Sequence, residues 1–326
     1  MKTHRLDAAP ETVHWGFFDA ALKPLITVEP GDEVVISTVS GVPSAMPAVD
    51  SGFTVPEVLR AIHARVPQKL NGPHILTGPV AVRGAKAGQV LEVRIKAIEL
   101  FYDWGYNAIR PLAGALPDDF ETARVIHIPL DRARKVGRLP WGLELPLKPF
   151  FGIMATAPPA AWGAVASPPP RRNGGNMDNK ELVAGATLYL PILNAGALFS
   201  AGDAHAAQGD GEVCINGIEC PADVSLRFKL HKHRPLAGPF VEASDGVGDT
   251  GKWVVVESAT DALQAARAAT SRMVDLLVAE WGFSPVHGYL LCSVAMDLRM
   301  AQVVNRPMIT VAASIAKSIL PERKLF

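Results

Sequence analysis

Hydrophobic and polar residues alternate over short stretches of the chain, and turn residues separate these stretches. In 91–96, Leu, Val and Ile alternate with Glu, Arg and Lys, the pattern of a strand with one buried face. The stretch 33–38, EVVIST, is rich in β-branched residues and follows the turn tripeptide Pro30-Gly31-Asp32. We therefore predict two short strands around that turn. Similar patterns predict strands at 80–82, 224–230 and 253–258.

Two connections carry more specific predictions. Gly84 and Gly88 flank a short link between 80–82 and 91–95, so we predict a hairpin there. The sequence PGDEVVI at 30–36 resembles AGQVLEV at 87–93. Two similar β units of this kind favour a pair of packed sheets.

A different pattern covers 260–281, where apolar residues recur at steps of three and four, as in an amphipathic helix. Thr260 or Asp261 is the expected N-cap and Gly282 the expected stop. We also predict a short helix at 56–65. Residues 150–176 read as an apolar strand followed by a proline-rich segment, which we expect to be an ordered loop over a site.

Glycine and proline together make up about one residue in six, more than the roughly 12% expected, and they are spread along the chain. This composition indicates many turns between short strands. The predicted fold class is therefore mainly β with a few helices (α+β). A chain of 326 residues can form a single domain, 1–326, and two β subdomains at 1–150 and 151–326 are an alternative.

Charge and composition exclude several kinds of partner. The 32 basic and 32 acidic residues balance, and no basic run indicates a nucleic-acid surface. No apolar run reaches the roughly 18–20 residues that span a bilayer, and the first residues lack the apolar core of a secretory signal. Three cysteines without a framework predict buried thiols and a cytoplasmic protein.

The stretch 174–220 concentrates acidic side chains among glycines, with Lys180 as its single lysine. Its candidate functional residues are Asp178, Asp203, His205, Gln208, Asp210, Glu212 and Glu219. Carboxylates close together raise one another's pKa unless a cation lies among them. A bound metal ion is the simplest counter-charge, and the alternative is a solvated acidic loop pair.

Spacing predicts which of these side chains meet. Asp203 and His205 are two apart, so on a strand they share a face. By the same rule Gln208, Asp210 and Glu212 share a face. Asn216-Gly217 is a strong hairpin signal, and a turn there would place Glu219 diagonally across from Glu212.

Carboxylate oxygens with one imidazole suit zinc, manganese or calcium. The ion would polarise a carbonyl and activate a water, and Glu212 would carry the proton with Asp210 tuning it or sharing the proton. Nucleophilic alternatives are weaker, because the chain has no G-x-S-x-G elbow, and acidic neighbours would disfavour a Cys214 thiolate. Neither a dinucleotide-binding fingerprint nor a P-loop is present.

Several stretches together resemble the acetamidase/formamidase family. They are GPHILTGPVAVRGAKAGQVLEV (72–93), FGIMATAPP (151–159), GGNMDNKELVAGATLYLPI (174–192), GALFSAGDAHAAQGDGEV (196–213), the pair Glu219-Cys220, and LLCSVAMDLRMAQVV (290–304). The resemblance implies a β/β/α layered, sandwich-like architecture and homo-oligomers, dimers or larger. It also implies hydrolysis of short linear amides to a carboxylate and ammonia, with a divalent metal in the site.

The family motif positions give a working assignment of roles. Asp178, Asp203, His205 and Glu219 are expected to hold the ion, zinc first with calcium or manganese as alternatives. Glu212 is the expected base with Asp210 beside it. Asn176, Gln208 and His74 are expected to orient the amide, although His74 also fits a surface turn.

The sequence departs from the family pattern in two places, and the second of these bears on the substrate. Gln89 replaces the usual acidic turn residue, where we expect little effect on the chemistry. The segment 101–150 carries aromatic residues. They either line a pocket for a substrate other than formamide or pack against the edge of the core. The alternatives to amide hydrolysis are cleavage of another C–N bond, in a cyclic amide or carbamate, and a non-catalytic β protein that binds calcium.

Overall fold

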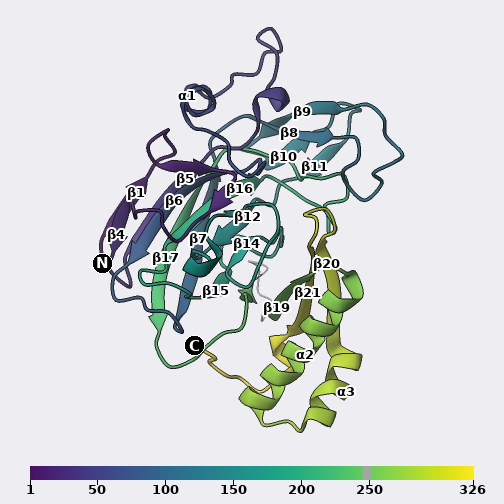
Figure 1. Ribbon diagram of the computed structural model, residues 1–326. Coiled ribbons are helices and arrows are strands. Elements are labelled where there is room, and N and C mark those ends of the chain that lie inside the picture. The colour runs from purple at the N-terminus through teal and green to yellow at the C-terminus, as the bar shows by residue number, and fades with distance from the viewer. Residues whose placement is uncertain (245–250) are drawn as a thin grey trace.

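Two large β-sheets and a pair of helices form three layers (Figure 1). The computed structural model describes residues 1–244 and 251–326. The nine-stranded sheet runs β1 (Thr3–Leu6), β5 (Glu33–Thr38), β17 (Ala222–His231), β7 (Val90–Leu100), β15 (Thr187–Pro191), β18 (Phe240–Ala243), β19 (Lys252–Ala259), β21 (Ile309–Ala316) and β20 (Met296–Gln302). The six-stranded sheet runs β14 (Gly174–Asn176), β12 (Phe150–Ala155), β16 (Phe199–His205), β6 (Ile75–Val82) and β2 (Val13–Trp15), with β4 (Ile26–Val28) also beside β6.

Smaller elements complete the chain. A four-stranded sheet contains β11 (Glu144–Pro146), β10 (Val136–Arg138), β9 (Arg124–Asp131) and β8 (Trp104–Ile109), and β3 (Phe17–Phe18) pairs with β13 (Val165–Ala166). The α-helices are α1 (Glu57–Arg65), α2 (Ala262–Trp281) and α3 (Pro285–Ala295). Short 3-10 turns occur at Pro43–Ala45, Ala160–Trp162 and Lys317–Ile319. None of the helices in the described ranges is long and apolar enough to cross a bilayer.

The core lies between the two large sheets. Phe151 and Met154 of the six-stranded sheet and Leu188 and Phe228 of the nine-stranded sheet are fully buried in one cluster. Burying one such side chain contributes about 1.5–3 kcal/mol. On its other face the nine-stranded sheet packs against α2, whose Met273 is fully buried there. The layers are thus sheet, sheet and helix, which confirms the predicted mainly β class and the β/β/α arrangement.

The helices and the turn at 30–32 form where the sequence predicts them. The Asp261 side chain accepts a hydrogen bond from the Gln264 N–H and caps α2, and Gly282 ends the helix with a φ of 70°. Helix α1 matches the predicted short helix at 56–65. Strands β4 and β5 flank Pro30-Gly31-Asp32.

The predicted hairpin between 80–82 and 91–95 is wrong. Both strands exist, but β6 belongs to the six-stranded sheet and β7 to the nine-stranded sheet, so their connection crosses from one layer to the other. Each strand pairs with segments far away in the sequence, β16 and β2 for β6 and β15 and β17 for β7. All eight residues of β6 are buried, as suits a central strand between two layers.

The two similar β units flank the same strand, because β5 and β7 both pair antiparallel with β17. Their turns are alike as well. The Asp32 Oδ2 accepts a hydrogen bond from the Glu29 N–H at 3.3 Å, and the Gln89 Oε1 accepts one from the Lys86 N–H at 3.0 Å. Gln89 therefore forms the turn hydrogen bond expected of the acid that it replaces, as the sequence predicts.

The segment 101–150 contains the four-stranded sheet. Trp104 is buried and donates to the Thr54 carbonyl, whereas Trp141 is 62% exposed. The His127 ring on β9 bonds the Ala45 carbonyl at 3.0 Å, so a backbone group satisfies this strand histidine. Both large sheets take strands from each side of residue 150.

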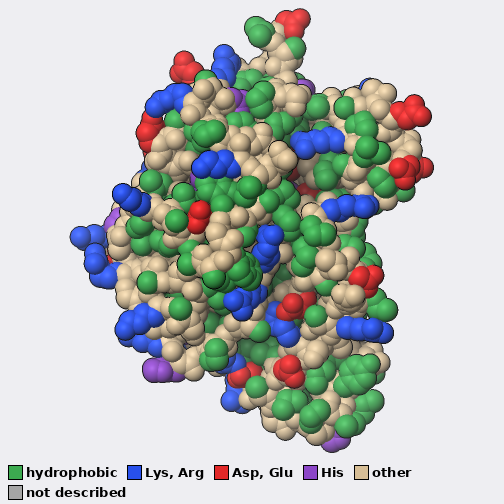
Figure 2. Space-filling view, in the orientation of Figure 1, with side chains coloured by type: hydrophobic (Ala, Val, Ile, Leu, Met, Phe, Trp, Pro, Cys, Tyr) green, Lys and Arg blue, Asp and Glu red, His purple; other side chains and the backbone are tan. Residues whose placement is uncertain are grey.

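The chain's tail and its cysteines complete this description. Phe326 stacks on Tyr189 with ring centroids 4.0 Å apart, so the tail docks on the protein's own nine-stranded sheet. All three cysteines are free, and Cys220 and Cys292 are buried as predicted, whereas Cys214 is half-buried. Lysine, arginine and acidic side chains are dispersed over the face drawn in Figure 2.

Candidate metal and active site

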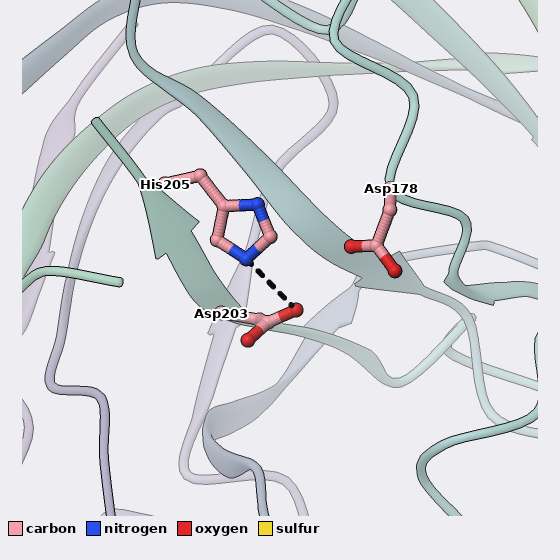
Figure 3. Close-up of side chains that lie close together, drawn as sticks. All are labelled: Asp178, Asp203 and His205. Carbon is pink, nitrogen blue, oxygen red and sulfur yellow. Dashed lines mark ion pairs between the residues drawn. The ribbon is translucent and has the colours of Figure 1, made fainter. Parts of the chain in front are cut away.

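A buried group of acids around His205 lies at the end of β16, in the six-stranded sheet. Asp203 and His205 are on that strand, and Asp178 follows β14 on the far side of β12. Figure 3 shows the Asp178 carboxylate on the other side of the space that the Asp203–His205 pair faces. The His205 Nε2 is 3.5 Å from the Asp203 Oδ2, which confirms that the two side chains meet.

Glu212 and Glu219 come to the same place from the segment that follows β16. The His205 Nε2 lies 2.8 Å from the Glu219 Oε1 and 4.0 Å from the Glu212 Oε1. The side chains form two groups, and within each group the possible ligand atoms lie within 4.8 Å of one another. One group is Asp178, Asp203 and His205, and the other is His205, Glu212 and Glu219. Each of these five side chains is buried.

Gln208 fixes the orientation of the His205 ring. Its Nε2 donates to the carbonyl oxygens of Asp178 and Ala301, at 2.9 and 3.3 Å. Its Oε1 therefore faces the His205 Nδ1, at 2.7 Å, and accepts a hydrogen bond from it. Because Nδ1 carries a hydrogen, the neutral ring presents a lone pair on Nε2 toward the acids, the arrangement typical of a metal-binding histidine.

The group carries more negative than positive charge, and its pKa values reflect this. Burial and the nearby Asp203 raise the pKa of Asp178 to about 6, and burial raises that of Glu219 to about 7. Burial and the charge of Asp178 raise the pKa of Glu212 well above its usual range. Burial opposes a charged His205, yet Glu219 and Asp203 hold the pKa of His205 well above its usual value.

Several buried atoms of the group have no hydrogen-bond partner. They are the Asp178 Oδ1, the Glu212 Oε2 and the Asn176 Oδ1. Among the described residues, no lysine or arginine forms an ion pair with Asp178, Asp203, Glu212 or Glu219. Unpaired buried acceptors are costly, and a cation bound among them would satisfy several at once. The donor set therefore fits a divalent metal ion.

The backbone is strained where the acids are placed. Ten non-glycine residues of the described chain have positive φ, and Asp178, Asp203 and Glu212 are three of them, at 45°, 60° and 49°. Such conformations cost about 1–3 kcal/mol each and cluster at functional sites. Gly152 on β12 makes room for two of these acids, because a Cβ there would lie 2.2 Å from the Asp178 Oδ1 and 2.7 Å from the Asp203 Oδ2.

A pocket of about 300 Å³ opens above the acids. Asn176, His74 and Tyr106 line it together with Asp203, Glu212 and Glu219. The His74 Nδ1 bonds the Ser167 Oγ at 2.8 Å, and its Nε2 lies 4.0 Å from the Asp203 Oδ1. Burial lowers the pKa of His74, which favours the neutral ring. His74 is thus a pocket residue and not a surface turn histidine.

Two expected placements are not found. Asp210 does not join Glu212, since its carboxylate lies 2.9 Å from the Lys180 Nζ and 3.8 Å from an Arg299 guanidinium nitrogen, partly exposed. The predicted hairpin at Asn216-Gly217 is also absent. Instead the Asn216 Oδ1 accepts hydrogen bonds from the Asn107 side chain and the Ala108 N–H on β8.

Glu219 still reaches the site, by another route. It forms isolated bridges with Tyr106 and with His205, which hold it beside the end of β16. Gln208 bonds the His205 ring and is not among the residues that line the pocket, so the structure gives it a positioning role toward the imidazole. The Cys214 thiol donates to the Asn107 Oδ1, away from the acids.

Several functional residues escape the sequence patterns. The Asn305 side chain donates to the Asp178 Oδ2 and to the Asn176 carbonyl, and the Ser40 hydroxyl donates to the Glu219 Oε2 at 3.2 Å. Both come from remote segments without a local motif. In the sequence, only the place of Asn305 could have suggested a role, because it directly follows the stretch 290–304 that resembles the family.

Comparison with known proteins gives a consistent result. The family model described as Acetamidase/Formamidase family matches residues 5–165 and 159–322. A formamidase from Methylophilus methylotrophus is 28% identical over 264 residues, which cover 64% of this chain and 62% of that protein. A curated relative from Schizosaccharomyces pombe is 30% identical over 216 residues, 49% of this chain and 52% of the relative. The chain thus spans about half to three fifths of the length of these curated relatives.

A solved structure matches over almost its whole length. An acetamidase from Bacillus halodurans superimposes with a TM-score of 0.82 at 29% identity, over 97% of this chain and 98% of that one. The three-layer architecture and the acids at the end of β16 are therefore placed within a known fold.

Proposed function

We propose that this chain, which belongs to the acetamidase/formamidase family, is a metal-dependent amidohydrolase that cleaves short linear amides to a carboxylate and ammonia. The observation that carries the proposal is the buried, uncompensated group of acids around the His205 Nε2. Strongly perturbed carboxylates in a pocket are typical of catalytic sites. Buried charges in structural ion pairs are instead balanced by opposite charges.

The donor chemistry supports a particular ligand set. Asp178, Asp203, His205 and Glu219 would hold the ion, with zinc ahead of manganese or calcium because calcium prefers six to eight oxygens and zinc accepts imidazole. When bound, a divalent ion polarises a carbonyl oxygen and lowers the pKa of a water. The Gln208–His205 bond keeps the imidazole in the required tautomer.

The chain's own residues would handle the proton. Glu212 is buried, its Oε2 is unpartnered, and its pKa is raised well above the usual range. A carboxyl with a raised pKa holds a proton more readily than a free one, so it can take a proton from water and give it to the leaving nitrogen. The unpartnered Asn176 Oδ1 can accept a hydrogen bond from the substrate NH₂ group, and His74 lines the same pocket.

The test is ammonia release from formamide, acetamide and propionamide before and after chelation, with zinc, manganese or calcium added back. We expect chelation to stop release and one metal to restore it, while circular dichroism shows that the fold persists. Ammonia release at the original rate from protein shown to be metal-free would overturn the metal dependence. Absence of ammonia from every amide would overturn the amidase proposal itself.

A further inference from the structure

Two arginines line the same pocket as the acids. Arg110 follows β8 and Arg306 follows β20, and both border the cavity that has Asp203, Glu212 and Glu219 in its wall.

Arg110 differs from every comparable arginine of the described chain. Six arginines are partly buried: Arg110, Arg171, Arg227, Arg234, Arg272 and Arg299. Five of them donate to a carboxylate or a backbone carbonyl. The Arg110 guanidinium, in contrast, has no hydrogen bond and no ion pair to any of the described residues, although the Arg110 backbone carbonyl accepts one from the Ala113 N–H. A half-buried guanidinium with five free donors is a group whose natural partner is an anion.

Part of the pocket wall is apolar. Val42, Leu112, Ile215 and Val304 line it. Two of these residues, Leu112 and Ile215, have positive φ, at 62° and 98°, so the wall is held in a strained conformation like the acids themselves. The pocket therefore has carboxylates, an apolar section and guanidinium groups within one cavity.

The size of the cavity fits a molecule larger than acetamide. At about 30 Å³ per water, 300 Å³ holds roughly ten waters, far more space than formamide or acetamide fills. A ligand that extends from the acids would reach the apolar wall and the arginines. A carboxylate at its far end would be repelled by the acids and attracted by Arg110, so the charges also fix which end enters first.

We infer that the substrate is a short amide with a carboxylate at its other end, a monoamide of a dicarboxylic acid. This inference rests on the proposed amidase function. In the reaction the oxygen of water bonds to the acyl carbon, the C–N bond breaks, and the nitrogen leaves as ammonia after taking a proton. The product is a dicarboxylate, and Arg110 and Arg306 select the substrate by its distal carboxylate.

The experiment compares succinamate with 4-oxopentanamide, a neutral amide of similar size that carries a methyl ketone in place of the carboxylate. The readout is the ratio of their kcat/KM values for ammonia release. Hydrogen bonds to charged groups are strong enough that we expect the wild type to favour succinamate by roughly 10–100-fold. Arg110→Gln should remove most of that preference, and Arg306→Gln, at an exposed residue, should remove a smaller part.

Arg267→Gln is the matched control, because it makes the same charge change at an exposed position of α2 and should leave the ratio unchanged. Cleavage of acetamide with a wild-type ratio near one would overturn this inference and leave the amidase proposal standing. An Arg110→Gln ratio equal to that of Arg267→Gln would do the same. If Arg110→Gln does not fold, the Arg306→Gln ratio decides. No ammonia from any amide would overturn both proposals.

Discussion

Two buried carboxylate–histidine pairs in this protein resemble each other in geometry and differ in surroundings. Glu92 on β7 is 1% exposed and lies 2.5 Å from the His231 Nε2. Glu219 at the candidate site is 5% exposed and lies 2.8 Å from the His205 Nε2. Around Glu92 there are further cations, since Arg94 bonds its carboxylate and the Lys229 Nζ lies 3.6 Å away. Around Glu219 the further charged side chains of the group are acids.

The difference appears directly in the pKa values. Burial raises the pKa of Glu92, but His231 and Arg94 outweigh it and the net pKa is lowered. Burial raises the pKa of Glu219 to about 7. A buried charge surrounded by opposite charges is a structural ion pair, whereas a buried excess of one sign needs a bound cation or protons. This contrast identifies the site among the protein's buried acids, and four substitutions test it.

The largest effect should follow Glu212→Gln. The amide keeps the size of the side chain but cannot carry the proton, so we expect kcat to fall by about 10²–10⁴-fold. Because metal binding is assigned to other side chains, the metal content should stay the same. Steady-state ammonia release and metal analysis of the purified variant measure both. A variant with near wild-type activity would show that Glu212 is not the base.

Gln208→Met should weaken metal binding without removing any ligand. The variant loses the acceptor that holds the His205 Nδ1 hydrogen, and loss of such outer partners typically costs 10–100-fold in metal affinity. Competition with a chromophoric chelator measures the Kd. Gln264→Met, at an exposed position of α2, is the control that should leave the Kd unchanged. Equal affinities in the two variants would contradict the positioning role of Gln208.

Glu92→Gln should lower stability and leave activity unchanged. Losing the carboxylate charge that Arg94, Lys229 and the His231 ring surround should reduce the free energy of unfolding by about 2 kcal/mol at pH 7. Folding lowers the pKa of Glu92, so its contribution is present above the unfolded value near 4.5 and is lost as pH falls through the folded value. The difference in the free energy of unfolding between wild type and variant, measured by urea unfolding, should therefore become smaller from pH 7 to pH 3. A change in ammonia release would contradict the contrast with the site.

Local patterns predicted the parts of the site that one strand carries. Asp203 and His205 share a face because they are two apart on β16, and the period of a strand guarantees that outcome. The helix at 260–281 followed from its spacing and its Asp261 cap in the same way. In each case the deciding interactions lie within a few residues of one another.

Remote interactions decided the rest. The Asn216-Gly217 hairpin did not form because the Asn216 side chain binds Asn107 and Ala108 on β8, about a hundred residues earlier. The link from β6 to β7 crosses between sheets because each strand pairs with distant segments. Asn305, Ser40 and Arg110 reach the pocket in the same manner, and no spacing rule connects them to the acids.

Substitution of Asp210 should have the smallest effect on activity. It tests most directly whether the role predicted from the sequence or the ion pair in the structure is relevant. The sequence placed it beside Glu212, whereas the structure places it in a partly exposed ion pair with Lys180 and Arg299. Such pairs contribute about 0.2–1 kcal/mol, so Asp210→Asn should lower stability by less than about 1 kcal/mol. Its kcat for ammonia release should stay within about twofold of wild type, since Asp210 does not contact the acids around His205. A fall in kcat as large as that of Glu212→Gln would instead mean that the segment after β16 rearranges during turnover, and Asp210 would regain the catalytic role predicted from its spacing.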